Sequence, residues 1–389
     1  MTYRIRTLNA ISQAGLSRLP ADQFAVGPDI ADPHALLLRS ASLHNQPIPA
    51  SVLAVARAGA GTNNIPIAEY SKRGIPVFNT PGANANAVKE LVVAGIFLAA
   101  RNIVDAAAFA HRLEGDHATM DKMVEAGKRN FVGFELPGRT LGVIGLGAIG
   151  VEVANVAISL GMRVLGYDPA ITVEHAWSLS AQVERVTKLE QLLKRSDIIT
   201  LHVPLVDGTR NLIGAPEFAA MKSSAVLINF ARGPIVNEQA LISALEGNEL
   251  RGYVCDFPTP TLNKRPRVVT LPHLGASTRE AEENCALMAA DQLRDYLVNG
   301  TIRNSVNFPR AELPRAEGRQ RITIANANVP NMVAQISALL GEASLNIADL
   351  LNGSRGELAY TQVDVDGPVP GALVERLRAV PGVLSARVI

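Results

Sequence analysis

The sequence predicts an α/β protein in which short apolar strands alternate with helices around parallel sheets. Apolar runs recur between helical stretches, which is typical of strands buried on both faces of a doubly wound sheet. One such run ends in the glycine-rich turn Gly145-Leu146-Gly147-Ala148-Ile149-Gly150, and a helical pattern follows. The C-terminal tail has a different order of elements, which favours a small antiparallel sheet covered by helices.

The glycine-rich turn has the spacing G-x-G-x-x-G, which is suited to the pyrophosphate of a dinucleotide. Gly145 permits a tight turn, Gly147 lets phosphate approach the backbone, and Gly150 lets helix and strand pack closely. Unpaired N–H groups at the helix start, which includes Ala148 and Ile149, would face the anion. Because the chain contains 31 glycines, this spacing also arises by chance, and the neighbouring elements must decide.

The elements after the turn support a cofactor site. Residues 151–160 are apolar at helical spacing, and residues 163–168 have the pattern of the next strand. Asp168 ends that strand about 20 residues after the turn, where a carboxylate accepts hydrogen bonds from ribose hydroxyls. Such a carboxylate would repel a 2′-phosphate, so the sequence predicts NAD over NADP. The alternative is that Asp168 serves only the turn before Pro169.

Composition and charge exclude several classes of protein. The 37 basic and 36 acidic residues leave no global field for nucleic acid or an anionic membrane, so we expect neither partner. Cys255 and Cys285 are too few for a disulfide framework, and the N-terminus lacks a signal-peptide pattern, so we expect a cytoplasmic protein. We expect no metal site. The apolar run 91–100 is too short to span a membrane and predicts a buried helix.

Basic residues end two apolar strands in the N-terminal part. Arg39 and Ser40 follow one strand, and Arg57 follows the next. Since ligands bind at the carboxyl ends of parallel strands, we expect these residues and the segment 79–84 to line one edge of a crevice. The loop after Arg57 contains Gly59 and other small residues, so its N–H groups and the guanidinium form an anion site. The alternative is that each arginine is a solvated surface residue.

Two further polar residues end strands in the cofactor half. Arg232 and His273 should both face the crevice where a nicotinamide lies. Arg232 offers a permanently charged fork for a carboxylate and its neighbouring carbonyl, and His273 titrates near neutral pH and suits proton transfer. The alternative for His273 is a hydrogen-bonded structural histidine. His202 also ends a strand, but we expect no catalytic role for it, and the nearby Pro204 lies in a loop beside the cofactor.

Five stretches together form a specific pattern that covers nearly the whole chain. They are the loop 57–64, residues 79–81, the glycine turn with Tyr167-Asp168-Pro169, residues 229–233 and residues 272–278. With them the chain resembles the D-isomer-specific 2-hydroxyacid dehydrogenases that carry a C-terminal ACT domain. The resemblance implies NAD-dependent oxidation of 3-phospho-D-glycerate to 3-phosphohydroxypyruvate, towards serine. Two alternatives are a glyoxylate or hydroxypyruvate reductase-like member of the family and a cofactor-sensing binding protein with a vestigial site.

The resemblance also implies which residues hold the ligands. Arg232 and His273 would be catalytic, with Arg232 on the substrate carboxylate and carbonyl and His273 as the acid and base. The substrate would be contacted by Arg39, Ser40, Arg57, Gly59 and Asn84, with the arginines on its phosphate. The cofactor would be contacted by Gly145, Gly147, Ala148, Ile149, Gly150, Asp168, Pro204, Phe230, Ala231, Asp256, Gly275 and Ala276.

The chain departs from the family's pattern around these residues. The family's catalytic Glu stands just before a Pro, a few residues beyond the Asp that aligns with Asp256, but residues 257–260 contain no acid. We hypothesise that Asp256 instead raises the pKa of His273 and fixes its tautomer. Ala41 stands where many relatives carry another basic residue, so phosphate recognition would depend more strongly on the two arginines.

The tail retains part of the family's serine-binding pattern of His, Asn, Pro and Gly. Here the pattern is Asn326, Asn328, Pro330 and Asn331, and Asn346 matches the partner position. Asn328 and Asn346 could hydrogen-bond an amino acid across a subunit interface. Serine is therefore a candidate effector, and we expect a homo-oligomer, either a dimer or a tetramer.

These observations predict three domains. A flavodoxin-like substrate-binding domain would comprise residues 1–93 and 280–310, because the helical stretch that begins near residue 279 returns to cover the first domain. A Rossmann NAD-binding domain would span residues 94–279. Residues 311–319 would form a linker, and residues 320–389 would form a βαββαβ ACT-like regulatory domain with an antiparallel sheet.

Overall fold

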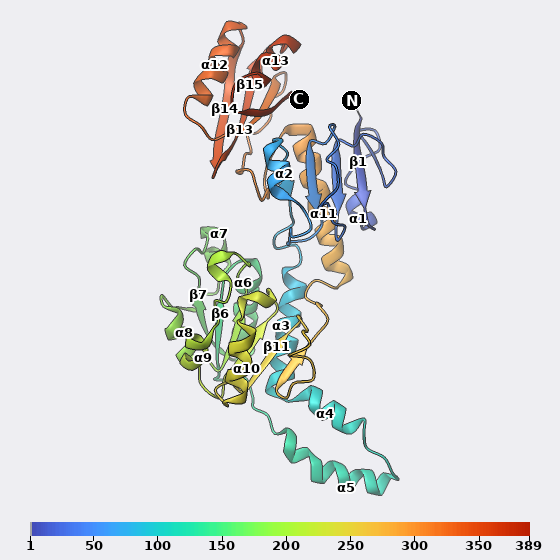
Figure 1. Ribbon diagram of the computed structural model, residues 1–389, viewed down its shortest axis with the longest axis vertical. Helices are drawn as coiled ribbons and strands as arrows, with labels where there is room; N and C mark the ends of the chain where they lie inside the picture. The colour runs from blue at the N-terminus through green and yellow to red at the C-terminus, as the bar shows by residue number, and fades with distance from the viewer. Residues whose placement is uncertain (1) are drawn as a thin grey trace. The chain divides into compact units, whose positions relative to one another are not determined.

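The computed structural model describes residues 2–389, which divide into two compact units (Figure 1). Unit 1 comprises the chain up to Asn84 together with residues 279–389, and unit 2 comprises residues 85–278. Each unit contains a parallel sheet, and unit 1 also contains an antiparallel one. The predicted α/β fold class is therefore confirmed.

The first part of unit 1 is a five-stranded parallel sheet in the flavodoxin-like order β2-β1-β3-β4-β5. The sequence pattern did not reveal β1 or β2. In β1, Arg4 and Arg6 flank Ile5 and interrupt the apolar run, and β2 is only four residues long. The elements are β1 (Tyr3–Leu8), α1 (Gln13–Leu16), β2 (Phe24–Gly27), β3 (Ala35–Leu38), β4 (Ala54–Arg57), α2 (Ile67–Lys72) and β5 (Val77–Phe78).

Helix α11 (Arg279–Asn299) packs on this sheet. Its buried residues Cys285, Ala289 and Leu293 share a hydrophobic core with Ile5 and Ala35 of the strands. The Gln292 side chain donates a hydrogen bond to the backbone oxygen of Asn79 over 3.1 Å. A segment distant in sequence therefore completes the first domain.

The C-terminal part of unit 1 has the order βαββαβ and a four-stranded antiparallel sheet, β14-β15-β13-β16. This arrangement is compatible with the predicted ACT-like fold. Ala325 and Tyr360 of this sheet belong to the same core as α11, so the tail packs on the first part of unit 1. The elements are β13 (Gln320–Ala327), α12 (Met332–Glu342), β14 (Asn346–Arg355), β15 (Leu358–Asp366), α13 (Gly371–Arg378) and β16 (Val383–Val388).

Unit 2 is built on a seven-stranded parallel sheet in the Rossmann order β12-β11-β10-β9-β6-β7-β8. The edge strand β8 is two exposed residues long, which is why no apolar run marked it. Its strands are β6 (Thr140–Ile144), β7 (Arg163–Tyr167), β8 (Glu184–Arg185), β9 (Ile198–Leu201), β10 (Val226–Asn229), β11 (Gly252–Cys255) and β12 (Val268–Thr270). Its helices are α3 (Ala85–Ala100), α4 (Ile103–Ala110), α5 (His117–Gly127), η1 (Lys128–Phe131), α6 (Ala148–Ser159), α7 (Val173–Ser178), α8 (Leu189–Arg195), η2 (Asp207–Thr209), α9 (Ala215–Ala220), η3 (Gly233–Ile235) and α10 (Glu238–Glu246).

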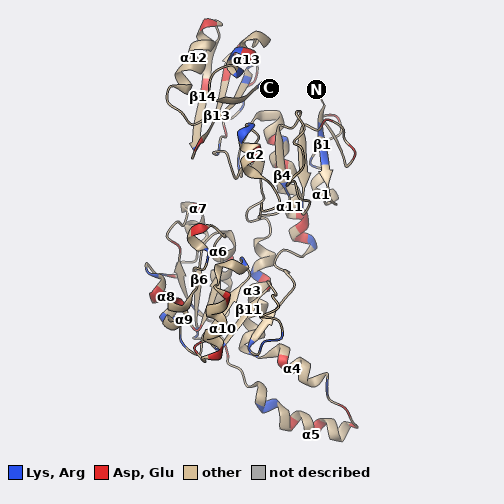
Figure 2. Cartoon of the chain, viewed as in Figure 1, with Lys and Arg blue, Asp and Glu red and all other residues tan. Residues whose placement is uncertain are grey.

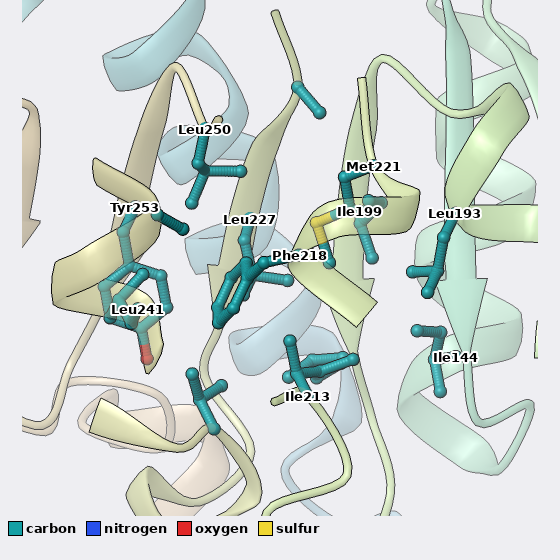
Figure 3. Packing of buried hydrophobic residues seen from close by; sticks show 14 of the residues in the cluster. Ile144, Leu193, Ile199, Ile213, Phe218, Met221, Leu227, Leu241, Leu250 and Tyr253 are labelled. Atoms are coloured by element: carbon teal, nitrogen blue, oxygen red, sulfur yellow. The ribbon is translucent and has the colours of Figure 1, made fainter. Parts of the chain in front are cut away.

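Helices bury both faces of this sheet, which explains the continuously apolar strands. In β10, Leu227 faces one hydrophobic cluster, whereas Val226 and Ile228 face another. Figure 3 shows the first cluster, in which Phe218 and Leu241 from the helices surround Leu227. The buried sheet holds its carboxyl ends at fixed positions, and the site residues of unit 2 follow those ends.

Charged residues of both signs are distributed over both units (Figure 2). Within residues 2–389, no single helix is long and apolar enough to span a membrane. The helix pair α3 and α4, bent by 66°, meets the length and composition test only when the two are taken together.

Candidate active site

The glycine turn of unit 2 has the close approaches that its spacing requires. Gly145 has φ 92°, and its N–H donates to the backbone oxygen of Tyr167 over 2.9 Å. A Cβ on Gly150 would lie 1.9 Å from the Gly145 oxygen, so only glycine fits there. A Cβ on Gly147 would meet no atom within 4 Å. Gly147 precedes α6, whose first residues are Ala148 and Ile149, so the space beside it adjoins free helical N–H groups.

Asp168 links the second strand to this turn. Its Oδ2 accepts a hydrogen bond from Leu146 N–H over 2.8 Å, and its Oδ1 accepts one from Ala170 N–H over 2.8 Å. The carboxylate thus supports its own turn as well as the glycine turn. A carboxylate has about four acceptor positions, so these two bonds leave capacity for ribose hydroxyls, and the two interpretations of Asp168 are compatible.

Arg232 follows β10 in a loop that Asn229 holds in place. The buried Asn229 amide donates to the Arg232 backbone oxygen over 2.9 Å, and its Oδ1 accepts from Ala231 N–H over 3.1 Å. The Arg232 guanidinium donates to the Ala231 oxygen over 2.7 Å and is half-buried. Phe230 is a buried core residue whose ring packs against Gly95 of α3. The side chain of Phe230 therefore supports the loop from beneath.

His273 follows β12 and has an unusual backbone conformation, with φ 47°. Its N–H donates to the Asp256 backbone oxygen over 3.0 Å, and its ring packs edge-on against Phe257 with 5.2 Å between centroids. The imidazole is exposed. A left-handed conformation at a non-glycine residue is strained, and here the strand-end contacts maintain it.

Asp256 is buried beside these two residues at the end of β11. Its Oδ2 accepts a hydrogen bond from Gly275 N–H over 3.1 Å, and its Oδ1 finds no hydrogen-bond donor among residues 2–389. Burial raises the pKa of this carboxyl, while the Gly275 N–H and the charges of His273 and Arg232 act in the opposite direction. Asp256, His273 and Arg232 therefore form one electrostatic group, with Gly275 and Ala276 in the adjacent loop.

His202 does not belong to the electrostatic group of Asp256, His273 and Arg232. Its ring makes a 2.9 Å hydrogen bond with the Thr200 hydroxyl, and desolvation lowers its pKa to about 3. Its backbone lies against Gly145, so the residue supports the glycine turn. Pro204 is exposed in the loop that follows β9, and its backbone oxygen accepts from the Thr209 hydroxyl over 2.5 Å.

In unit 1, Arg39 and Arg57 lie at the ends of the paired strands β3 and β4. Arg57 Nε donates to the Arg39 backbone oxygen over 2.8 Å, and its guanidinium also bonds the Gly61 oxygen. Gly59 leaves room for this guanidinium, because a Cβ there would lie 3.2 Å from its terminal nitrogen. The Arg39 guanidinium forms a 2.7 Å ion pair with Glu282 of α11. The structure therefore gathers the two predicted anion-binding side chains and adds an acid.

The neighbouring polar residues define the turn after β3. Asn9 Oδ1 accepts hydrogen bonds from Ser40 N–H over 3.1 Å and Ala41 N–H over 2.6 Å. Asn84 Oδ1 is buried and has no hydrogen-bond donor among residues 2–389. The Ser40 backbone N–H is thus engaged by Asn9, whereas the Asn84 amide oxygen remains an acceptor without a donor in the described chain.

Sequence reasoning missed two polar residues of unit 1, Asn9 and Glu282. Asn9 directly follows β1, so the strand-end rule would have found it if β1 had been recognised. Glu282 lies in the first turn of α11, and no local signal indicates its ion pair with a residue so far away in the sequence.

The predicted regulatory asparagines of the tail use their amides within their own domain. Asn328 donates to the Gly356 oxygen over 3.0 Å, and Asn346 donates to Asp366 Oδ2 over 2.7 Å. They lie after β13 and at the start of β14, which are not neighbours in the sheet.

Comparison with known proteins identifies the family. A family model described as the NAD-binding domain of D-isomer specific 2-hydroxyacid dehydrogenases matches residues 97–275. D-3-phosphoglycerate dehydrogenase of Escherichia coli K12 is 34% identical over 99% of this chain and 95% of that protein. The chain belongs to the D-isomer-specific 2-hydroxyacid dehydrogenases. It is an NAD-dependent oxidoreductase of that family.

Two further relatives of this dehydrogenase family extend the likeness. D-3-phosphoglycerate dehydrogenase 2 of Saccharomyces cerevisiae is 31% identical over 90% of this chain and 76% of that protein. The NAD⁺-bound crystal structure of 3-phosphoglycerate dehydrogenase from Entamoeba histolytica is 27% identical, with a TM-score of 0.63, and covers 79% of this chain and 99% of that one.

The residues of unit 2 fit NAD. Gly147 provides an open approach for the pyrophosphate beside the start of α6, and Asp168 has spare acceptor positions for the ribose. The buried Asp256 Oδ1 is an acceptor without a donor in the described chain, which suits the amide N–H of a nicotinamide.

Proposed function

We propose that this chain oxidises 3-phospho-D-glycerate to 3-phosphohydroxypyruvate with NAD, in a cytoplasmic step towards serine. The observation that carries the proposal is the pair of arginines at neighbouring strand ends of unit 1, in a chain related over 99% of its length to a D-3-phosphoglycerate dehydrogenase. Arginine forks suit a phosphate better than point charges do. The free, buried Cys255 and Cys285 agree with a reducing compartment.

In this proposal, each residue of unit 2 has a defined task. Arg232 holds the substrate carboxylate and polarises the neighbouring C2 oxygen with the charge of its guanidinium. His273 accepts the proton of the C2 hydroxyl in the oxidation and returns it in the reverse reaction. Bound NAD supplies the hydride acceptor.

Asp256 is proposed as the positioning residue that takes over from the family's glutamate. Its backbone oxygen binds the N–H of His273, and its buried side chain contributes a charge beside the imidazole. A carboxylate at this position also favours one orientation and tautomer of the imidazole. Asp256 therefore acts on His273 through its charge and its hold on the backbone.

Arg39, Arg57, Ser40, Gly59 and Asn84 would contact the substrate. The buried acceptor oxygen of Asn84 supports this assignment, because a hydroxyl group of the ligand would satisfy it.

The proposal includes a regulated homo-oligomer, a dimer or a tetramer. Exposed apolar side chains on α4 and α5, Ile103, Val104, Met123 and Val124, support association between subunits. Serine would bind near Asn328 and Asn346, whose amide oxygens can accept further hydrogen bonds.

The experiment is an NADH absorbance assay with 3-phosphohydroxypyruvate, hydroxypyruvate and glyoxylate, with and without serine. We expect turnover of the phosphorylated substrate at the lowest KM and inhibition by serine. Arg57→Met should raise KM for the phosphorylated substrate at least tenfold more than KM for hydroxypyruvate. Lys72→Met, which removes an exposed cation of unit 1, is the matched control and should change neither. A preference for glyoxylate or hydroxypyruvate would instead assign a reductase of that class, and absence of turnover would indicate a binding protein.

A further inference from the structure

Arg39, one of the two proposed phosphate-binding arginines, already holds an acid within unit 1. Its terminal nitrogen lies 2.7 Å from a carboxylate oxygen of Glu282. The two side chains are 40% and 44% exposed, so the pair lies at the surface, where an added anion can reach it. Exposed ion pairs contribute little to stability, and this one can open at small cost.

Glu282 belongs to the same charge cluster as both arginines. Burial raises the pKa of the Cys285 thiol, while a Thr80 hydrogen bond and the charges of Arg39 and Arg57 lower it and the charge of Glu282 raises it. The charges of Arg39, Arg57 and Glu282 therefore all affect the pKa of the same buried thiol. The two arginines alone would carry a charge of two, and the carboxylate of Glu282 reduces the net charge of these three side chains to one.

The position of Glu282 is set by the fold. It lies in the first turn of α11, where a helix favours a negative charge, and the Gln292 side chain of α11 is hydrogen-bonded to the Asn79 backbone. The hydrophobic residues of α11 lie in the core of the sheet that carries β3 and β4. The helix therefore holds the Glu282 carboxylate within reach of Arg39.

We propose that Glu282 is an internal competitor for phosphate, a specificity-determining carboxylate that occupies the Arg39 guanidinium until a phosphate displaces it. The proposal rests on the proposed phosphate-binding role of Arg39. A phosphate dianion brings more charge and more acceptor oxygens than one carboxylate, so it displaces Glu282. The displacement makes binding of phosphorylated substrates and of free phosphate weaker than the two arginines alone would allow, and an unphosphorylated substrate is not affected.

The test uses the full-length enzyme and Glu282→Gln, which keeps the size of the side chain and removes its charge. KM for 3-phosphohydroxypyruvate and the competitive inhibition constant of inorganic phosphate should both fall about three- to fivefold, the range of an exposed ion pair. KM for hydroxypyruvate should remain within twofold. Glu280→Gln is the matched control, because Glu280 is an exposed acid of the same helical turn and should leave all three values unchanged.

Calorimetric titration of inorganic phosphate into the same proteins separates this proposal from the proposed reaction. Tighter phosphate binding by Glu282→Gln supports the competitor role even if the wild-type enzyme fails to turn over phosphorylated substrate. A higher KM and weaker phosphate binding in Glu282→Gln would show that the carboxylate positions Arg39 for the ligand and would overturn the proposal. Equal constants in wild type, Glu282→Gln and Glu280→Gln would overturn it as well.

Discussion

Asp256 is the residue at which the fold opposes ionisation, because burial raises the pKa of its carboxyl and one of its oxygens has no donor in the described chain. A group whose pKa is higher in the folded state stabilises the fold below its unfolded pKa. That contribution is lost as the pH rises through the folded pKa. Above the folded pKa, the ionised form of Asp256 therefore reduces stability, which is a common feature of residues that serve chemistry.

We expect Asp256→Asn to raise the midpoint of thermal unfolding at pH 7 and to lower turnover, because the charge beside His273 is removed while an oxygen remains for Gly275 N–H. The stability difference should shrink as the pH falls through the folded pKa, and the pH profile of turnover should shift. Scanning calorimetry and the NADH assay between pH 4 and 9 measure both effects. An unchanged turnover profile would contradict the positioning role.

Asp197, in the same unit, is a control because its pKa shifts in the opposite direction to that of Asp256. Burial acts to raise the pKa of Asp197, but hydrogen bonds from Lys222 and Thr140 N–H outweigh it and hold the pKa below its usual value. Its contribution is present above the unfolded pKa and is lost as the pH falls through the folded pKa. Asp197→Asn should therefore lower the unfolding midpoint at pH 7.

Strand, turn and helix of the cofactor site could be predicted from the sequence because each has a local cause. Gly145 and Gly150 carry backbone requirements in their own spacing, and α6 and β7 follow from apolar periodicity. Interactions that α11 makes with the first domain could not be predicted in detail. The contact of Glu282 with Arg39 depends on the packing of segments that are far apart in the chain, and the sequence around either residue does not indicate the other.

Substitutions in the glycine turn should separate effects on folding from effects on cofactor binding. Gly147→Ala places a methyl group in open space at an ordinary φ of −73°, so it should change the unfolding midpoint little, while it obstructs the pyrophosphate and raises KM for NAD about tenfold or more. Gly150→Ala meets the Gly145 oxygen at 1.9 Å and should destabilise unit 2. The exposed Gly341→Ala in α12 also enters open space and should leave KM for NAD unchanged. Equal KM values for Gly147→Ala and wild type would refute this use of the turn.

At the scale of the whole molecule, a buried ion pair joins the tail to the rest of unit 1. Arg321 of β13 and Asp364 of β15 are 0% and 1% exposed, and both guanidinium contacts with the carboxylate are 2.7 Å long. The same guanidinium donates to the backbone oxygens of Asn299, Leu313 and Pro314, at the end of α11 and in the following segment. Because the Arg321 guanidinium binds the tail sheet, the connecting segment and α11, the tail is an integral part of unit 1.

Removal of one partner of this pair leaves the other charge buried, so Asp364→Ala should cost about 3–5 kcal/mol of unfolding free energy. Arg319→Met is the control, because its ion pairs with Asp349 and Asp366 are partly exposed and contribute only about 0–1 kcal/mol. Since Tyr360 and Ala325 share a core with α11, the loss should appear in calorimetry as a lower midpoint for unit 1 as a whole. A separate early transition of the tail, with the remainder of unit 1 melting as in wild type, would show instead that the tail folds independently and that the shared core does not couple the two sheets.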